Sequence, residues 1–233
     1  MGMGYRVSFA GGVFHVTTRG NNREPIFLDE HDFHRYKSLL RRYRNKFHFN
    51  LYAYSLMPNH VHLLIETSAD GSISKIMHAI NTAYAMYFNN RHDHTGHVFQ
   101  GRFHSAVVDS ETYLLEVMRY MDLNPVRAGI AKRPSEYEWT SYRRYAADDG
   151  DDVITPHHIY ENLGTQDRKR QRVYREFVEE GIGRPSPGYA HSIFIGGDDF
   201  IGRMERIYGA EIWPKYRRLL DRLNALRSAA LPE

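Results

Sequence analysis

The sequence predicts an α+β fold of the ferredoxin-like, split βαβ type, in which helices cover one face of an antiparallel sheet. The main observation is the order of its patterns, which runs strand, helix, strand, strand, helix, strand and then a further helix. The 233-residue chain is also 42% hydrophobic, with 17 tyrosines and 12 phenylalanines, which is enough apolar surface for a substantial core. We expect a mainly helical extension to follow this unit.

Four stretches rich in β-branched and aromatic residues predict the strands. They are residues 12–18, 50–57, 60–66 and 98–108. A polar turn, Arg19–Arg23, follows the first strand, and Pro58-Asn59 separates the second from the third as a turn or bulge. Gly101 indicates a bulge within the fourth.

Three stretches with apolar residues at helical spacing predict the helices of the core. They are residues 29–47, 72–91 and 109–123. Asp29 is a suitable N-cap for the first of them, and Asn124-Pro125 ends the third. A short helical element with a buried Trp139 is expected over residues 134–145.

An acidic segment, residues 148–152, is the predicted linker between a catalytic domain, 1–147, and an extension, 148–233. Residues 1–147 contain 18 Lys and Arg and 13 Asp and Glu. Residues 148–233 contain 13 Lys and Arg and 15 Asp and Glu. Arginine dominates the basic set and suits nucleic acid, although an ordinary, slightly basic surface explains the charge equally well. Helices of the extension are expected over residues 160–180, 199–208 and 213–226.

Several classes of protein are excluded by composition. The chain has no cysteine, which excludes a disulfide framework and thiolate zinc sites. No apolar run approaches the ~18 residues of a membrane span, so no membrane partner is expected. Residues 1–5 lack the apolar region of a secretory signal, and we expect a cytoplasmic protein.

His60 and His62 are the most informative residues, because they stand two apart inside a predicted strand. Side chains alternate along a strand, so both imidazoles project from the same face. Such a pair is half of a metal site, although structural histidines are an equally good explanation at this point. A second group, His92, His94 and His97, lies in a polar loop and is interpreted as solvated or facing a substrate.

Tyr120 and Asn124 are separated by one helical turn and therefore share a helix face. A phenol and an amide would then be presented together. Without context, a buried tyrosine and an asparagine at a helix C-terminus would be the better interpretation.

Two motifs supply the context. Pro58-Asn59-His60-Val61-His62-Leu63-Leu64 is followed about 60 residues later by Arg119-Tyr120-Met121-Asp122-Leu123-Asn124-Pro125-Val126-Arg127-Ala128-Gly129. In this order the motifs resemble the single-tyrosine HUH transposases, and within them the REP-associated tyrosine transposases. The runs Phe14–Arg23 and Gln100–Phe103 support the resemblance, which covers about residues 10–145.

The resemblance implies a metal-dependent enzyme that cleaves and rejoins single-stranded DNA at palindromic hairpins through a 5′-phosphotyrosine. It makes Tyr120 the nucleophile, and His60, His62 and Asn124 the ligands of a divalent ion. Mixed nitrogen and oxygen ligands suit Mg²⁺ or Mn²⁺, while the histidines alone would also accept Zn²⁺. The ion itself, or a basic neighbour such as Arg119, would assist deprotonation of the phenol.

Polar residues in or beside the matching motifs are the expected DNA contacts. They are Arg19, Asn21, Asn22, Arg23, Arg102 and Arg127. Two alternatives stay open, a domesticated hairpin-binding protein without productive transposition and a nickase of the relaxase or replication-initiator kind. A monomer is favoured over a homodimer because the extension would replace a partner, and the resemblance places the protein at the bacterial nucleoid.

Overall fold

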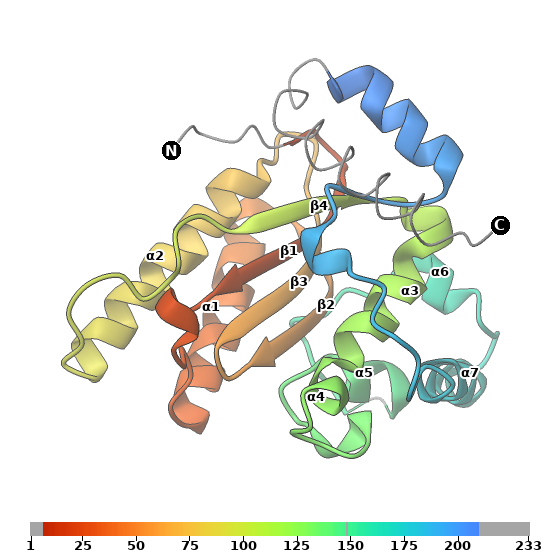
Figure 1. The fold of residues 1–233 in the computed structure, drawn as a ribbon. Coiled ribbons are helices and arrows are strands. Elements are labelled where there is room, and N and C mark those ends of the chain that lie inside the picture. Colours follow the sequence, from red (N-terminus) through yellow and green to blue (C-terminus); the bar gives the residue numbers. More distant parts are fainter. Residues whose placement is uncertain (1–6, 148, 210–233) are drawn as a thin grey trace, which may run out of the picture.

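The computed structural model describes residues 7–147 and 149–209, which contain a mixed five-stranded sheet of order β2-β3-β1-β4-β5 (Figure 1). The strands are β1 (Val13–Arg19), β2 (Asn50–Met57), β3 (His60–Glu66), β4 (His104–Val108) and β5 (Phe194–Ile195). The first four pair antiparallel, and β5 joins β4 in parallel. The predicted α+β class is confirmed, with a fifth strand that comes from the C-terminal part.

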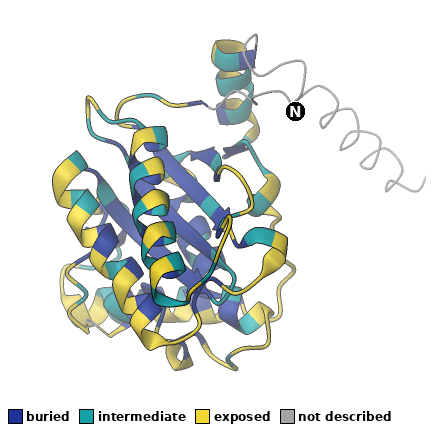
Figure 2. Cartoon of the chain, turned by 90° about the vertical axis from the view of Figure 1, so that its left-hand side faces the viewer, coloured by how far each residue is buried: buried dark blue, intermediate teal, exposed yellow. Residues whose placement is uncertain are grey.

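Two helices, α1 (Glu30–Phe47) and α2 (Ile73–Arg91), cover one face of the sheet, as predicted. The Asn81 amide of α2 donates to Thr18, which stands opposite Val61 on that face. The opposite face, which the prediction left uncovered, packs against α3 (Ser110–Asp122). Figure 2 shows the buried sheet behind helices whose outer sides are exposed.

The remaining helices are short and mostly follow α3. They are α4 (Asn124–Arg127), α5 (Tyr142–Ala146), α6 (His158–Glu161), α7 (Asp167–Glu179), the 3₁₀ turns η1 (Asn21–Arg23), η2 (Pro134–Glu136) and η3 (Tyr189–His191), and helical residues 198–209. Trp139, which lies between η2 and α5 in the sequence, is buried, as expected. Among the described residues, no helix combines the length and apolarity that a membrane crossing requires.

Two predicted elements differ from the structure, and a third cannot be compared with it. The strand predicted over 98–108 begins only at 104, because Gly101 turns the chain at a φ of +73° and the preceding segment forms a single bridge, Phe99 to Gly20. The helix predicted over 160–180 is divided into α6 and α7. The helix predicted over 213–226 lies outside the described residues.

Both edges of the antiparallel unit are covered by later segments of the chain. At the β2 edge, the Leu56 N–H donates to the Trp139 carbonyl at 2.8 Å. At the β4 edge, the Val107 N–H donates to the Ile193 carbonyl at 2.8 Å, next to β5. These hydrogen bonds occupy part of the ladder of each edge strand, which limits its pairing with a second chain.

The acidic segment expected as a linker packs against α1 instead. The Asp151 carboxylate lies 2.9 Å from Lys37 Nζ and accepts a hydrogen bond from the Tyr54 hydroxyl. Asp152 forms an ion pair with Arg41 of the same helix. These contacts follow from charge complementarity between an acidic loop and a basic helix face, and the domain boundary at 147/148 stays a prediction.

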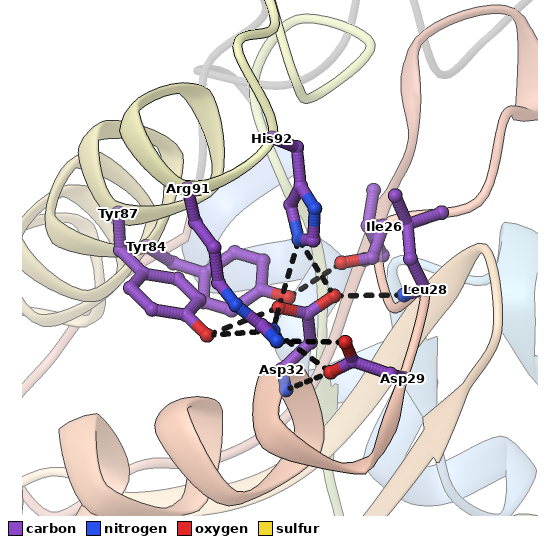
Figure 3. Close-up of polar contacts among 8 residues, drawn as sticks. All are labelled: Ile26, Leu28, Asp29, Asp32, Tyr84, Tyr87, Arg91 and His92. Carbon is purple, nitrogen blue, oxygen red and sulfur yellow. Dashed lines mark hydrogen bonds and ion pairs between the residues drawn. The ribbon is translucent and has the colours of Figure 1, made fainter.

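The buried Asp32 carboxylate holds the start of α1 to the end of α2 (Figure 3). It accepts from the Leu28 N–H at 2.8 Å, Arg91 at 2.7 Å and the Tyr87 hydroxyl at 3.1 Å. His92 lies 3.0 Å away, so this histidine belongs to the structural core rather than to a solvated loop. Burial alone would raise the pKa of Asp32, but the hydrogen bonds outweigh it and the pKa is lowered.

We predict that Asp32→Asn lowers the free energy of unfolding at pH 7 by about 3 kcal/mol, because the carboxylate that accepts these bonds is lost. A lowered folded-state pKa stabilises the fold above the unfolded value of ~3.9 and loses that effect as pH falls through the folded value. Urea unfolding at pH 7 and at pH 3 measures both effects. The wild type and variant should converge at low pH, whereas the exposed Glu30→Gln control should stay within about 0.5 kcal/mol of wild type.

Candidate active site

The pairing of β1 with β3 assembles one polar face of the sheet. In this register Thr17 stands opposite His62 and Arg19 opposite His60. Directly opposed residues of an antiparallel pair share a face, so these four side chains project together. The imidazoles of His60 and His62 are neighbours, with ring centroids 5.0 Å apart.

Each of the two imidazoles is held through its Nδ1 atom. His60 Nδ1 lies 2.7 Å from Asn59 Oδ1, and His62 Nδ1 lies 2.9 Å from His15 Nε2 and 3.2 Å from Thr17 Oγ1. Burial lowers the pKa of His60 to about 4 and that of His62 well below its usual range. Both rings are therefore neutral at pH 7, the form in which an imidazole ligates a metal through its second nitrogen.

The Tyr120 side chain projects from the last turn of α3 onto this face of the sheet. Its ring lies edge to face with those of His15 and His62, each at 5.7 Å, and its side chain is buried. Burial raises the pKa of Tyr120, while the charge of Arg127 and the amide of Asn124 act to lower it. The Arg127 guanidinium lies 5.7 Å from the Tyr120 ring centroid and donates to the Tyr120 carbonyl.

The basic neighbour of Tyr120 is therefore Arg127 and not Arg119, which sequence reasoning suggested. Arg119 forms an ion pair with Glu116, and its guanidinium lies 4.2 Å from the ring centroid of Phe177. One residue along a helix changes direction by about 100°, so Arg119 points away toward α7.

A pocket of about 450 Å³ brings the predicted residues together. His60, His62, Tyr120 and Asn124 line it, together with three of the predicted arginines, Arg19, Arg23 and Arg102. The pocket also contains residues that sequence analysis did not assign: Thr17, Asn59, Gln100, His104, Ala190 and His191. The last two come from η3, far along the chain, and no local motif marks them.

The two predicted asparagines of η1 lie outside this pocket. Asn21 lines a neighbouring hollow between α2 and residues 96–101, and its N–H donates to the Val98 carbonyl at 2.9 Å. Asn22 is exposed and adopts a positive φ of 51°. The turn thus places Asn21 beside the site and leaves Asn22 in solvent.

The donor set of the pocket fits a divalent ion. Two neutral imidazoles and one amide keep the full charge of the ion and leave positions for other ligands. The buried Asn124 amide nitrogen, a donor, has no hydrogen-bond partner among the described residues, and the atom of this side chain that would ligate an ion is the amide oxygen. His60, His62 and Asn124 are the residues that would hold Mg²⁺ or Mn²⁺ here.

A separate group of potential ligands consists of Glu111, His157 and His158, whose ligand atoms lie within 4.8 Å of one another. Glu111 stands at the other end of α3, nine residues before Tyr120 and roughly 14 Å along the helix axis. This group is therefore distinct from the histidines of the pocket.

The C-terminal part of the chain packs on α3 at two points. The Tyr174 hydroxyl of α7 donates to the buried Asp122 carboxyl at 2.6 Å, and burial raises the pKa of Asp122 to about 8. The Tyr189 ring of η3 lies 5.4 Å from the ring of Tyr120. The helix that carries Tyr120 and precedes Asn124 is thus held between the sheet and later elements.

The mixed five-stranded sheet with its helices has the fold of a solved tyrosine transposase. Residues 9–124 match the family described as "Transposase IS200 like", and this part of the chain belongs to that family. A family of transposases is a family of DNA-processing enzymes. No curated protein sequence matches the chain.

The solved structures that are similar to this chain include the following two. One is a REP-associated tyrosine transposase bound to a REP hairpin, with a TM-score of 0.54 and 19% sequence identity, covering 67% of this chain and 92% of that chain. The other is a putative transposase from Deinococcus radiodurans R1, with a TM-score of 0.37 and 21% identity, covering 52% and 95%. The first agrees with the fold described above.

We predict that Tyr174→Phe lowers the free energy of unfolding by about 1–3 kcal/mol, because the buried Asp122 carboxyl loses its hydrogen-bond donor. Tyr142→Phe is the matched control, since the buried Tyr142 hydroxyl has no hydrogen-bond partner among the described residues. Its removal should change stability little. Urea unfolding of both variants measures the difference, and equal losses would show that packing alone joins α7 to α3.

Proposed function

We propose that this protein is a metal-dependent tyrosine transposase of the HUH type that cleaves and rejoins single-stranded DNA at hairpin sequences. The observation that carries the proposal is the meeting of His60, His62, Asn124 and Tyr120 in one pocket. A nucleophile, a metal-ligand set and cationic side chains are the parts that phosphodiester transfer requires.

The arginines of the pocket support a polyanionic substrate. Arg19, Arg23 and Arg102 come from β1, η1 and the turn before β4, so they surround the histidines from different elements. Guanidinium groups bind phosphate oxygens in a bidentate manner and position a DNA backbone without reading its sequence. The proposed substrate strand lies across these groups with its scissile phosphate beside Tyr120.

In the proposed reaction the Tyr120 Oη atom attacks phosphorus, and the bond from phosphorus to the 3′ oxygen breaks. The phenol loses its proton, the departing 3′ oxygen takes up one proton to become a hydroxyl, and the 5′ phosphate stays on Tyr120. A divalent ion held by His60, His62 and Asn124 would supply positive charge to the phosphate. Because the new bond is also a phosphodiester, a 3′-hydroxyl can reverse the step and rejoin strands.

Protein groups prepare Tyr120 for this attack. Arg127 places positive charge near the ring, which favours the phenolate, while Asn124 lies one turn further on. The rings of His15 and His62 fix the tyrosine ring from the side of the sheet. A fixed, partly buried phenol loses little freedom when the phosphate arrives.

Hairpin DNA is the proposed substrate. Within the family, we assign the protein to the REP-associated branch. The similar solved structure is itself bound to a REP hairpin. In this proposal the extension at residues 148–233 serves as an accessory unit that binds the hairpin. The protein acts as a monomer. It works in the bacterial cytoplasm, at the nucleoid.

We expect the wild type to form a covalent adduct with a 3′-labelled hairpin oligonucleotide in the presence of Mn²⁺, seen on a denaturing gel, because the DNA on the 3′ side of the cleaved bond stays on Tyr120. Tyr120→Phe should abolish the adduct, because no other group in the pocket is placed as this phenol is. Hairpin affinity by fluorescence anisotropy should stay near wild type in the variant. Tight binding with no adduct from the wild type, on any hairpin tested, would favour a domesticated binding protein instead.

For the metal, we predict that His60→Ala and His62→Ala each reduce cleavage by about 100-fold or more, since several kcal/mol of charge stabilisation are lost. Hairpin binding should persist, because the arginines are unchanged. His158→Ala, from the separate ligand group on α6, is the matched control and should cleave normally. A His158→Ala defect with intact His60→Ala activity would place the functional metal elsewhere.

A further inference from the structure

His15 is a buried residue beside the site that packs against Tyr120 and whose ring nitrogens the proposed chemistry does not use. It lies on the central strand β1, two residues before Thr17 and therefore on the same face as His62. Its ring is fully buried and lies within 3° of parallel to that of His62, with His15 Nε2 only 2.9 Å from His62 Nδ1. Two imidazoles in this arrangement are joined by a hydrogen bond.

That hydrogen bond contains one proton, because two facing ring nitrogens 2.9 Å apart can bond only when one carries a proton and the other a lone pair. The proton has two possible positions. Either His62 Nδ1–H donates to His15 Nε2, or His15 Nε2–H donates to His62 Nδ1. A neutral imidazole has one N–H and one lone pair, so the position of this proton decides which nitrogen of His62 carries its single N–H and which carries its lone pair.

Only the first arrangement is compatible with a metal ligand. When His62 Nδ1 carries the proton, its Nε2 presents a lone pair to the pocket. In the second arrangement His62 Nε2 is protonated and cannot ligate. The far nitrogen of the other ring, His15 Nδ1, has no hydrogen-bond partner among the described residues, so no further described group holds the His15 proton in place.

We infer that His15 is a positioning residue that accepts the Nδ1 proton of His62 and so directs the His62 Nε2 lone pair toward a divalent ion. This inference rests on the metal site of the proposed function. His15 acts as the acceptor behind a metal-bound histidine, a place that carboxylates and backbone carbonyls take in many metal sites. Thr17 Oγ1, at 3.2 Å, is the longer and secondary contact.

Mn²⁺ affinity of the full-length protein tests the inference without reference to activity. Free Mn²⁺ is measured by electron paramagnetic resonance, and His60→Ala gives the background from other sites, including Glu111, His157 and His158. His15→Phe should weaken binding about 10–100-fold, as loss of such an acceptor typically does. His15→Gln, whose amide oxygen can take the place of Nε2, and Thr17→Val should stay within about threefold of wild type.

Three outcomes would overturn the inference. His15→Phe could bind Mn²⁺ as wild type does, His15→Gln could lose as much affinity as His15→Phe, or Thr17→Val could show the large loss instead. Wild type that binds no more Mn²⁺ than His60→Ala would instead refute the metal site of the proposed function. The two failures are therefore distinguishable.

Nitrogen-15 spectra of the histidine rings in the wild type give a second test that needs no variant and no refolding control. With Mg²⁺ added, the His62 proton should reside on Nδ1 and the His15 proton on its own Nδ1. For the Mn²⁺-binding test described above, circular dichroism checks that the His15→Phe variant folds. A His62 ring that keeps its proton on Nε2 in the Mg²⁺-loaded protein would contradict the inference even if every variant folds.

Discussion

The register between β1 and β3 is the constraint on which the rest of the site depends. Seven consecutive pairs, from Val13 opposite Glu66 to Arg19 opposite His60, join the two central strands. The register places Thr17 across from His62 and His15 on the diagonal, and it brings Arg19 to the edge of the pocket. A slip by one residue would turn every one of these side chains to the opposite face. The apolar residues that alternate with them, such as Val16 and Leu63, hold the register because their face is buried under α1 and α2.

Burial then sets the chemistry of the polar face. The same loss of solvent keeps His60 and His62 neutral and raises the pKa of Tyr120. The first effect suits metal ligation, whereas the second opposes a nucleophilic phenol. Arg127, an exposed residue, offsets part of the second effect with a nearby positive charge. The proposed site thus combines a desolvated pair of imidazoles with a phenol whose pKa stays raised.

The segments after residue 147 form part of the sheet and of the packing around α3 and the pocket. Tyr160 and Tyr174 join Tyr145 in a packed tyrosine cluster behind α3, and η3 reaches over to Tyr120 and the pocket. β5 adds to the sheet edge beside β4. Because α3 lies between the sheet and these elements, its final turn is supported from both sides. The position of Tyr120 relative to the histidines therefore depends on both ends of the described chain.

The sequence by itself determined the local elements and the motif residues. Alternation over residues 50–66, helical spacing over 72–91 and the Asp29 cap are short-range patterns, and the structure reproduces them closely. It also singled out His60 and His62 by their spacing, whereas the expected roles of these histidines, Tyr120 and Asn124 came from the resemblance of the two motifs to the single-tyrosine HUH transposases. Only the tertiary structure decided that His15 stands behind His62, that Arg127 rather than Arg119 accompanies Tyr120, and that His191 lines the pocket. These contacts depend on strand register, helix rotation and the return of a distant segment, and the energies that select them come from burial of the whole core rather than from any local run of residues.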